Sequence, residues 1–349
     1  MAQIATIAGV PVVKIGHGLM SMTTKPEPLS DDQCFESIIA GINAAPERKS
    51  VFEQWRVLWS TAPCNHQFRT PEQILHEVSR ACRADFLVCQ SELTKGPDMV
   101  EEGIARSINN IIEKLGPNKK IDLFQPARID PEISIEETMT TLNKYVEYGK
   151  IGSIGLSECS EATLVRASKV GSIAAVEIEV SFWSYEKETR KVIAAAHKLG
   201  TVVAAYSPLG SGFLTGEVPQ ELPKGDLRNR FPRFQGEAFE NNLNLVNALK
   251  QIAGRKNLTL AQLCLAWVCS LGPHVVPIPS STRAERTLEN LAAASVALTA
   301  EDHADINCAV ELNPVSGTRY PESGMKLLWD RRNPINQFDN NAMYSIEGV

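Results

Sequence analysis

The chain has 349 residues and a formal net charge of -6. This is long for one average domain but normal for a single α/β barrel. Acidic and basic residues are interspersed without a basic stripe, which argues against a nucleic acid partner. Nowhere do 18 apolar residues follow one another, so no membrane-spanning helix is predicted.

The 8 cysteines form neither a C-x-x-C pair nor a Cys/His cluster with metal-ligand spacing. We therefore expect reduced thiols and no bound metal. The N-terminus shows no charged and long apolar run and no cleavage pattern, so the predicted location is cytoplasmic.

The first hundred residues divide into two parts. Residues 4–20 predict a short hairpin followed by a strand, and residues 31–44 predict a helix. Residues 49–92 differ, because they show no clear alternation of strands and helices. This anomalous segment is too long for a structureless loop in a compact domain.

From about residue 100 the pattern is regular. A helix with isoleucines at helical spacing ends at Gly116-Pro117, and Ser134 with Glu137 forms a capping box for another. Short apolar strands alternate with such helices. The predicted strands cover residues 121–125, 151–156, 174–180, 201–206 and 275–279.

Nearly continuous apolar strands that alternate with helices indicate a parallel sheet covered by helices. No G-x-G-x-x-G turn follows a first strand, which disfavours a doubly wound dinucleotide-binding sheet. We predict an α/β fold, a single (β/α)8 TIM barrel over residues 1–349. Its second and third strand region, about 49–92, is expected to be degenerate or poorly formed, and residues 321–349 form a C-terminal tail.

Active sites of such barrels lie at the C-terminal ends of the strands. Polar or aromatic residues follow several predicted strands at these points. Ser281, a helix start and Arg286 come close together in the last of these clusters, a combination that suits a phosphate monoester. The alternative is that Ser281 only caps the helix and Arg286 is only a solvated side chain.

Several of these motifs resemble the aldo-keto reductase family as a set, in order and in spacing. Residues 122–130, Asp-Leu-Phe-Gln-Pro-Ala-Arg-Ile-Asp, resemble its fungal pyridoxal reductase branch. The resemblance covers residues 1–48 and about 93–320. Its motifs are Gly18-Leu19-Met20, Gly155-Leu156-Ser157, Tyr206-Ser207-Pro208-Leu209-Gly210, Leu214-Thr215-Gly216, Ile278-Pro279-Ser280-Ser281, Arg286 and Glu289-Asn290.

The resemblance implies a reductase that uses NADPH. Ser157, Glu158 and Glu177 would hold the nicotinamide carboxamide, although most family members have Asn and Gln where the two glutamates stand. Tyr206 would stack on the nicotinamide ring. The remaining assignments are Ser207, Leu209 and Gly212 at the pyrophosphate, Ser281 and Arg286 at the 2′-phosphate, and Glu289 and Asn290 at the adenine.

The family's catalytic set of Asp, Tyr, Lys and His is not found. The histidine position falls on Ala127, a departure that the pyridoxal branch shares. The other three belong to the second and third strands. No tyrosine occurs before Tyr145, and no lysine lies between Lys49 and Lys95.

One hypothesis is that residues 49–92 are translated from a shifted reading frame. Codons can be chosen for residues 54–59 that, read one base later, give Asn-Gly-Glu-Phe-Tyr-Gly, and for residues 88–91 that give Ser-Val-Lys. Both resemble the catalytic motifs of the branch. The alternative is true divergence of the segment.

Three functions follow. The first is NADPH-dependent reduction of a small aldehyde or ketone, such as pyridoxal, by a monomer. The second keeps the reaction but makes the protein a tailoring reductase in fungal secondary-metabolite or toxin biosynthesis. The third is a catalytically impaired nucleotide-binding homologue, because the cofactor half is intact and the catalytic half is absent.

Overall fold

The computed structural model describes residues 4–23, 29–44, 51–54, 86–90, 97–118 and 120–329. Eight of its strands form two four-stranded parallel sheets, in the orders β3-β4-β5-β6 and β10-β9-β8-β7. The strands are β3 (His17–Gly18), β4 (Val51–Gln54), β5 (Phe86–Gln90), β6 (Leu123–Gln125), β7 (Gly155–Ser157), β8 (Ala175–Glu179), β9 (Val202–Tyr206) and β10 (Val275–Pro277).

The two sheets join at both edges and close into one barrel. The backbone N–H of Gly18 donates to the carbonyl of Pro279 at 3.0 Å, which places β3 beside the end of β10. At the other seam the N–H of Phe124 donates to the carbonyl of Ser153, also at 3.0 Å. The predicted (β/α)8 barrel is thereby confirmed.

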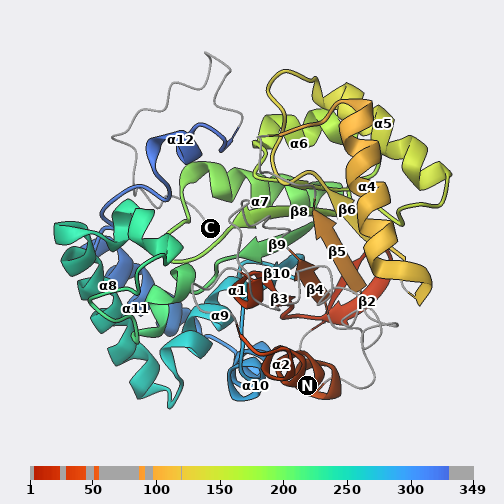
Figure 1. Ribbon diagram of the computed structural model, residues 1–349. Helices are drawn as coiled ribbons and strands as arrows, with labels where there is room; N and C mark the ends of the chain where they lie inside the picture. The colour runs from red at the N-terminus through yellow and green to blue at the C-terminus, as the bar shows by residue number, and fades with distance from the viewer. Residues whose placement is uncertain are drawn as a thin grey trace.

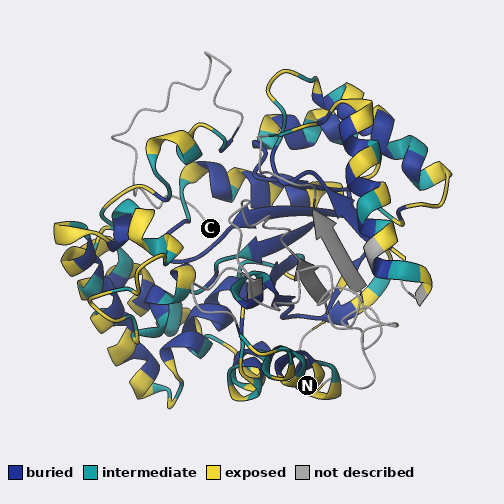
Figure 2. Ribbon diagram, viewed as in Figure 1, coloured by how far each residue is buried: buried dark blue, intermediate teal, exposed yellow. Residues whose placement is uncertain are grey.

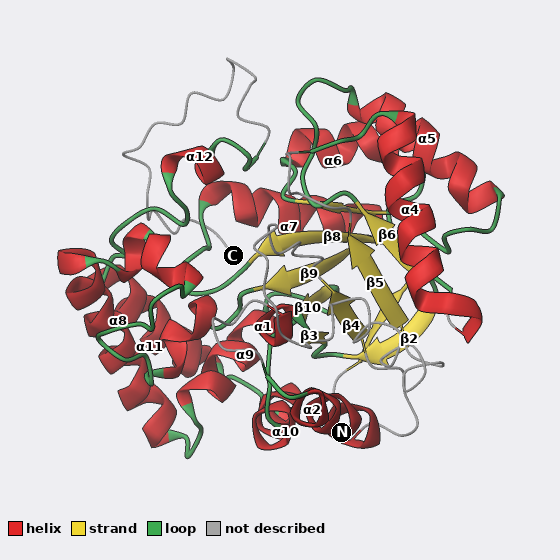
Figure 3. Cartoon of the chain, in the orientation of Figure 1, coloured by secondary structure: helices red, strands yellow, loops and turns green. Residues whose placement is uncertain are grey.

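Helices surround the strands, as Figures 1 and 3 show. Ser134 and Thr259 each cap a helix through a capping box with the residue three positions on. The long helices are α2 (Asp31–Ala44), α4 (Glu101–Leu115), α5 (Ile135–Glu147), α6 (Glu161–Ser168), α7 (Lys187–Leu199), α8 (Gly236–Arg255), α9 (Leu260–Ser270), α10 (Ala284–Ala292) and α11 (Ala300–Leu312). Two short helices are α1 (Met20–Thr23) and α12 (Glu322–Met325).

Apolar side chains fill the barrel interior from its N-terminal end. A hairpin of β1 (Ile4–Ile7) and β2 (Val10–Val13) packs into the same cluster as the inward-facing residues of the barrel strands. A second, larger cluster lies between strands and helices. In Figure 2, β6 to β10 are mostly buried, whereas the outer faces of the helices are exposed. The interior cluster contains Ala5, Ile7, Val12, Leu123, Ala175, Val202, Ala204, Val276 and Ile278.

Two strands form inside the anomalous segment 49–92. β4 pairs in register with β3 and β5, and β5 pairs with β6, so the sheet is continuous there. The expectation that the second and third strands are poorly formed is therefore corrected at these residues. The sequence did not predict these strands, because runs of four and five residues are too short to show a clear hydrophobic pattern. The rest of the segment lies outside the described residues.

The seam between β3 and β10 gives a test of the closure. A Cβ added at Gly18 would lie 2.8 Å from the backbone oxygen of Ile278, whereas one added at Gly254 on α8 would meet no atom within 4 Å. We expect Gly18→Ala to lower the free energy of unfolding by about 1–3 kcal/mol through overpacking. Gly254→Ala should raise it by about 0.5–1 kcal/mol, because alanine favours the helix. Urea unfolding of both variants is the measurement, and equal stabilities would contradict the described closure.

Candidate functional site

The barrel interior changes from apolar to polar at the C-terminal ends of its strands. Side chains two apart on a strand face the same side. Beyond Leu123 on β6 comes Gln125, and beyond Ala175 on β8 come Glu177 and Glu179. All of these side chains are buried, and the amide of Gln125 donates to the carboxylate of Glu177. A buried polar layer at this end of a (β/α)8 barrel marks a candidate active site.

The backbone is strained where two strands leave this layer. Glu158 follows β7 with φ 52°, and Ser207 follows β9 with φ 46°. Residues other than glycine rarely adopt this left-handed conformation, and it tends to cluster at functional sites. The carbonyl of Glu177 accepts a hydrogen bond from the N–H of Glu158 at 2.9 Å and helps to hold the first of these turns.

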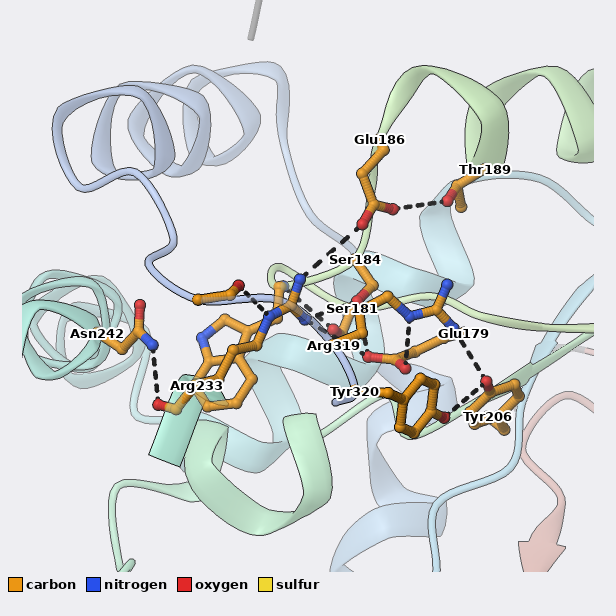
Figure 4. A network of polar contacts seen from close by, with 12 residues as sticks. Glu179, Ser181, Ser184, Glu186, Thr189, Tyr206, Arg233, Asn242, Arg319 and Tyr320 are labelled. Atoms are coloured by element: carbon orange, nitrogen blue, oxygen red, sulfur yellow. Dashed lines mark hydrogen bonds and ion pairs between the residues drawn. The ribbon is translucent and has the colours of Figure 1, made fainter. Parts of the chain in front are cut away.

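Four residues form a polar group at this end, which we call the mouth cluster: Glu158, Tyr206, Arg319 and Tyr320. Glu158 and Arg319 are buried, and the two tyrosines are half-buried. Arg319 Nη2 donates to Glu158 Oε1 at 2.8 Å and to Tyr206 Oη at 2.9 Å. The hydroxyls of Tyr206 and Tyr320 are 3.1 Å apart. Figure 4 shows three of the four side chains converging with Glu179.

Glu179 extends the ionic network away from the mouth cluster. Its Oε2 accepts from Arg319 Nε at 2.9 Å, while its Oε1 accepts from the hydroxyl of Ser184 at 2.6 Å. Arg233 Nη1 lies 2.9 Å from the same hydroxyl and 3.7 Å from Glu179 Oε1. Two arginines therefore neutralise two carboxylates in a buried region. Removal of any one of them would leave a buried charge without its partner.

Burial and charge compete in the mouth cluster. Burial alone would raise the pKa of Glu158, but the positive charges of Arg319 and Arg128 outweigh it and hold that pKa below its ordinary value. Burial raises the pKa of Tyr206 well above its ordinary range, and the charge of Glu158 adds to the effect. Glu158 is therefore ionised near neutral pH, and Tyr206 is a weak acid.

Four buried polar atoms near these strand ends have no hydrogen-bond partner. They are Gln125 Oε1, Ser157 Oγ, Glu158 Oε2 and Arg319 Nη1. A buried polar atom destabilises the folded protein unless a ligand or a water molecule forms a hydrogen bond with it. The set offers two acceptors, one donor and one hydroxyl that can do both. A primary carboxamide, which both donates and accepts, fits this set.

The residues predicted to hold a phosphate lie at the start of α10. Ser281 is buried, and its hydroxyl hydrogen-bonds the backbone of Arg283 without capping the helix. Arg286 lies in the first turn, where it pairs with Glu289 at 3.3 Å and with Glu217. Asn290 is buried one turn further on. Glu217 directly follows residues 210–216, which we call the glycine loop, so this ion pair links that loop to α10.

The remaining predicted residues follow β9. Ser207 and Leu209 lead into a 3₁₀ segment, Gly210–Thr215, whose Gly212 has φ 91°. Ala127 is buried just beyond β6, and its carbonyl accepts from Arg128 Nη1 at 2.6 Å. The positions of the missing Tyr and Lys motifs lie largely outside the described residues.

Sequence reasoning missed Arg319, Tyr320, Glu179 and Arg128. Glu179 had a readable signal, because it shares a strand face with Glu177. Arg319 and Tyr320 come after the last barrel helix, between Gly317 and Pro321, and no periodicity places such a segment. Within the described ranges no group of three or more His, Cys, Asp or Glu could hold a metal. The same residues include no helix long and apolar enough to cross a membrane.

The buried pair gives a prediction on pH. Replacing Glu158 with Gln should lower the free energy of unfolding at pH 7 by roughly 3 kcal/mol, as when a buried pair loses one partner. The folded-state pKa of Glu158 is depressed, so its contribution is complete above about 4.5 and is lost as the pH falls through the lower folded value. Urea unfolding should therefore show the two proteins converging in acid. Glu136→Gln, in an exposed pair with Arg166, is the control and should change stability by under about 1 kcal/mol. A pH-independent gap would refute the assignment.

Comparison with known proteins places the chain in one family. The sequence profile of the aldo/keto reductase family matches residues 70–311, so its match begins inside the anomalous segment. The chain is 39% identical over 243 residues to the aldo-keto reductase yakc of Schizosaccharomyces pombe, covering 68% of this chain and 70% of that protein. It is 37% identical over 236 residues to the aldo-keto reductase str7 of Strobilurus tenacellus, covering 66% and 69%.

Solved structures share the fold. The glycerol dehydrogenase of Gluconobacter oxydans superposes with a TM-score of 0.76 at 20% identity, covering 90% of this chain and 97% of that one. An aldo-keto reductase of Bombyx mori in complex with NADP superposes with a TM-score of 0.67 at 17% identity, covering 95% and 99%. The profile match over residues 70–311 shows that the chain belongs to the aldo/keto reductase family.

Proposed function

We propose that this protein binds NADPH and reduces a small aldehyde or ketone to an alcohol. The observation that carries the proposal is the set of unpartnered buried atoms on Gln125, Ser157, Glu158 and Arg319 at the strand ends. Their donors and acceptors match a nicotinamide carboxamide. The name of the Schizosaccharomyces pombe relative includes NADP(+), which agrees with this choice of cofactor.

The nicotinamide end of the site belongs to β7, β8 and β9. Ser157, Glu158 and Glu177 would hold the carboxamide, and Tyr206 would stack on the ring. When bound, NADPH supplies the hydride. Glu158 uses one oxygen on Arg319 and on the N–H of Glu179, at 3.0 Å, which leaves its second oxygen for the carboxamide N–H.

The adenosine end belongs to the glycine loop and α10. Ser207, Leu209 and Gly212 would cover the pyrophosphate. Ser281 and Arg286 would bind the 2′-phosphate, where the helix N-terminus adds a favourable dipole. Glu289 and Asn290 would contact the adenine. Arg286 pairs with Glu217 and Glu289 in the described structure, so a bound phosphate would compete with two carboxylates for it.

The catalytic half of the site is incomplete as the chain is written. Ala127 stands at the histidine position and cannot move a proton. Tyr206 and Tyr320 have hydroxyls here, but burial raises the pKa of both, so neither donates a proton readily. A missing general acid lowers the rate typically by about 10²–10⁴-fold. This favours a second candidate function, a nucleotide-binding homologue with little turnover.

The substrate class rests on fewer observations. Residues 122–130 resemble the pyridoxal reductase branch, and pyridoxal is therefore the first aldehyde to test. A tailoring step in fungal secondary metabolism would use the same reaction on another carbonyl compound. Loops set substrate choice in such barrels. The outcome with pyridoxal separates the two readings.

Arg286 gives the sharpest test of the cofactor. We expect Arg286→Met to weaken binding of NADPH by about 10–100-fold, because a charge-assisted pair to phosphate is worth roughly 1.5–3 kcal/mol. NADH lacks that phosphate, so its affinity should stay within about twofold. Fluorescence titration with both nucleotides measures this.

The matched control is Arg255→Met on α8, where the arginine pairs with Asp305 on the surface. It should bind both nucleotides as the unaltered protein does. Equal losses for NADPH and NADH in Arg286→Met would contradict a 2′-phosphate site.

The anomalous segment gives a second test. We propose that residues 49–92 arise from a shifted reading frame, and the genomic and transcript sequences of codons 45–95 examine it directly. A chain carrying the restored segment should gain about 10²–10⁴-fold in turnover of pyridoxal with NADPH. Equal binding of NADPH by both chains is the control. Codons that do not yield the tyrosine and lysine motifs one base on would end this hypothesis, and rapid turnover by the chain as written would exclude the impaired homologue.

A further inference from the structure

The C-terminal segment, residues 313–329, reaches back into the site. Its Arg319 lies 140 residues after Glu179 and 113 after Tyr206, yet it is only 5% exposed. Asn242 on α8 fixes the start of the segment through two hydrogen bonds to Ser316, at 2.8 Å and 3.0 Å. Arg233 adds a bond from Nε to the carbonyl of Gly317 at 3.2 Å. The segment is therefore anchored to the barrel two and three residues before Arg319.

Arg319 itself is held by carboxylates through Nε and Nη2 and by two aromatic rings. The rings of Tyr320 and Trp329 each lie 5.7 Å from its guanidinium carbon, a distance at which a cation interacts with an aromatic ring. Trp329 also donates its backbone N–H to the carbonyl of Glu158 at 3.2 Å. Glu179 binds Nε at 2.9 Å. The guanidinium is thus fixed before any ligand arrives, which is what a preorganised site requires.

One nitrogen of Arg319 contacts two residues of the proposed nicotinamide site. Nη2 donates both to Glu158 Oε1 and to Tyr206 Oη. These two residues come from different strands, β7 and β9, which are not neighbours because β8 lies between them. A single buried donor therefore binds both the carboxylate and the tyrosine, which also hydrogen-bond each other through their side chains. Without it, the hydroxyl of Tyr206 would retain Tyr320 as a described partner in the mouth cluster.

We propose that Arg319 is a positioning residue that aligns Tyr206 and Glu158 as two sides of the nicotinamide pocket. The inference rests on the proposed function, since it assumes that Tyr206 stacks on the nicotinamide. It adds that the stacking ring is oriented through its hydroxyl by the C-terminal segment. The ring alone is then insufficient for full affinity. An arginine over a hundred residues away contributes by holding Tyr206 and Glu158 in place, in addition to the donor that its Nη1 offers to the carboxamide.

A double-mutant cycle with Arg319→Met and Tyr206→Phe tests this. Each variant should weaken NADPH binding by about tenfold, as expected when a hydrogen bond to a charged group is lost. The double variant should lose less than the sum of the two single losses, because both changes remove the contact between Arg319 and Tyr206. Arg319→Lys keeps the charge and should recover part of the affinity. Fluorescence titration at one pH, with circular dichroism to verify folding, provides the data.

Arg233→Met is the matched control. It removes the other buried arginine beside Glu179 and the bond to Gly317, while the two bonds from Asn242 still hold the segment at Ser316. No described bond joins Arg233 to Tyr206 or Glu158. It should lower the thermal midpoint while leaving NADPH affinity within about twofold. A structural role for Arg319 alone would make the two arginine variants behave alike.

The outcomes separate the two proposals. If the unaltered protein fails to bind NADPH, the proposed function is wrong and the positioning role with it. If it binds but Tyr206→Phe binds equally well, the positioning role is overturned while the proposed function stands. Additive losses in the double variant would overturn it too. Tyr206→Phe removes only a hydroxyl and keeps the apolar contacts of the ring. Its NADPH affinity therefore tests the positioning role even if Arg319→Met does not fold.

Discussion

The buried pairing of Arg319 with Glu158 and Glu179 is the constraint on which the rest of the site depends. Two carboxylates on neighbouring strands would repel each other and lose hydration in an apolar surrounding. The guanidinium binds both through different nitrogens and makes their burial possible. Its position in turn fixes where the C-terminal segment lies. A contact between residues far apart in the chain thereby determines the shape of the barrel mouth.

Much of the fold could be predicted because it depends on local patterns. Capping boxes at Ser134 and Thr259 mark two helix starts directly in the sequence. The apolar runs on either side of them mark buried strands in the same way. The strand-end residues Ser157, Glu177 and Tyr206 followed from those strands by one rule about barrels. The prediction that the second and third strands are poorly formed failed at β4 and β5. Each strand has only four or five residues, and the sequence around them shows no hydrophobic periodicity that would identify so short a strand.

The C-terminal half of the mouth cluster could not be predicted for a different reason. Arg319 and Tyr320 belong to no helix or strand, and the hydrogen bonds that they make to Glu158, Glu179 and Tyr206 join residues more than a hundred positions apart. A lone arginine in a loop is usually solvated, so the sequence around Arg319 predicts an exposed side chain. Only the positions of Glu158, Glu179 and Tyr206 in three dimensions show that an arginine is needed there.

The division of the protein into two halves follows from which strands carry which task. The nucleotide contacts proposed here come from β7 to β10 and their loops. The sequence of these strands contains the family's motifs, and buried polar side chains lie at their ends. The resemblance assigns proton transfer to residues of the second and third strands, in the segment where the chain departs from the family's motifs. β4 and β5 still pair with their neighbours, so the barrel closes without those side chains. Closure depends on backbone hydrogen bonds, which any sequence can supply, whereas proton transfer depends on particular side chains. A change confined to residues 49–92 can therefore remove catalysis and leave the cofactor half of the barrel unaltered.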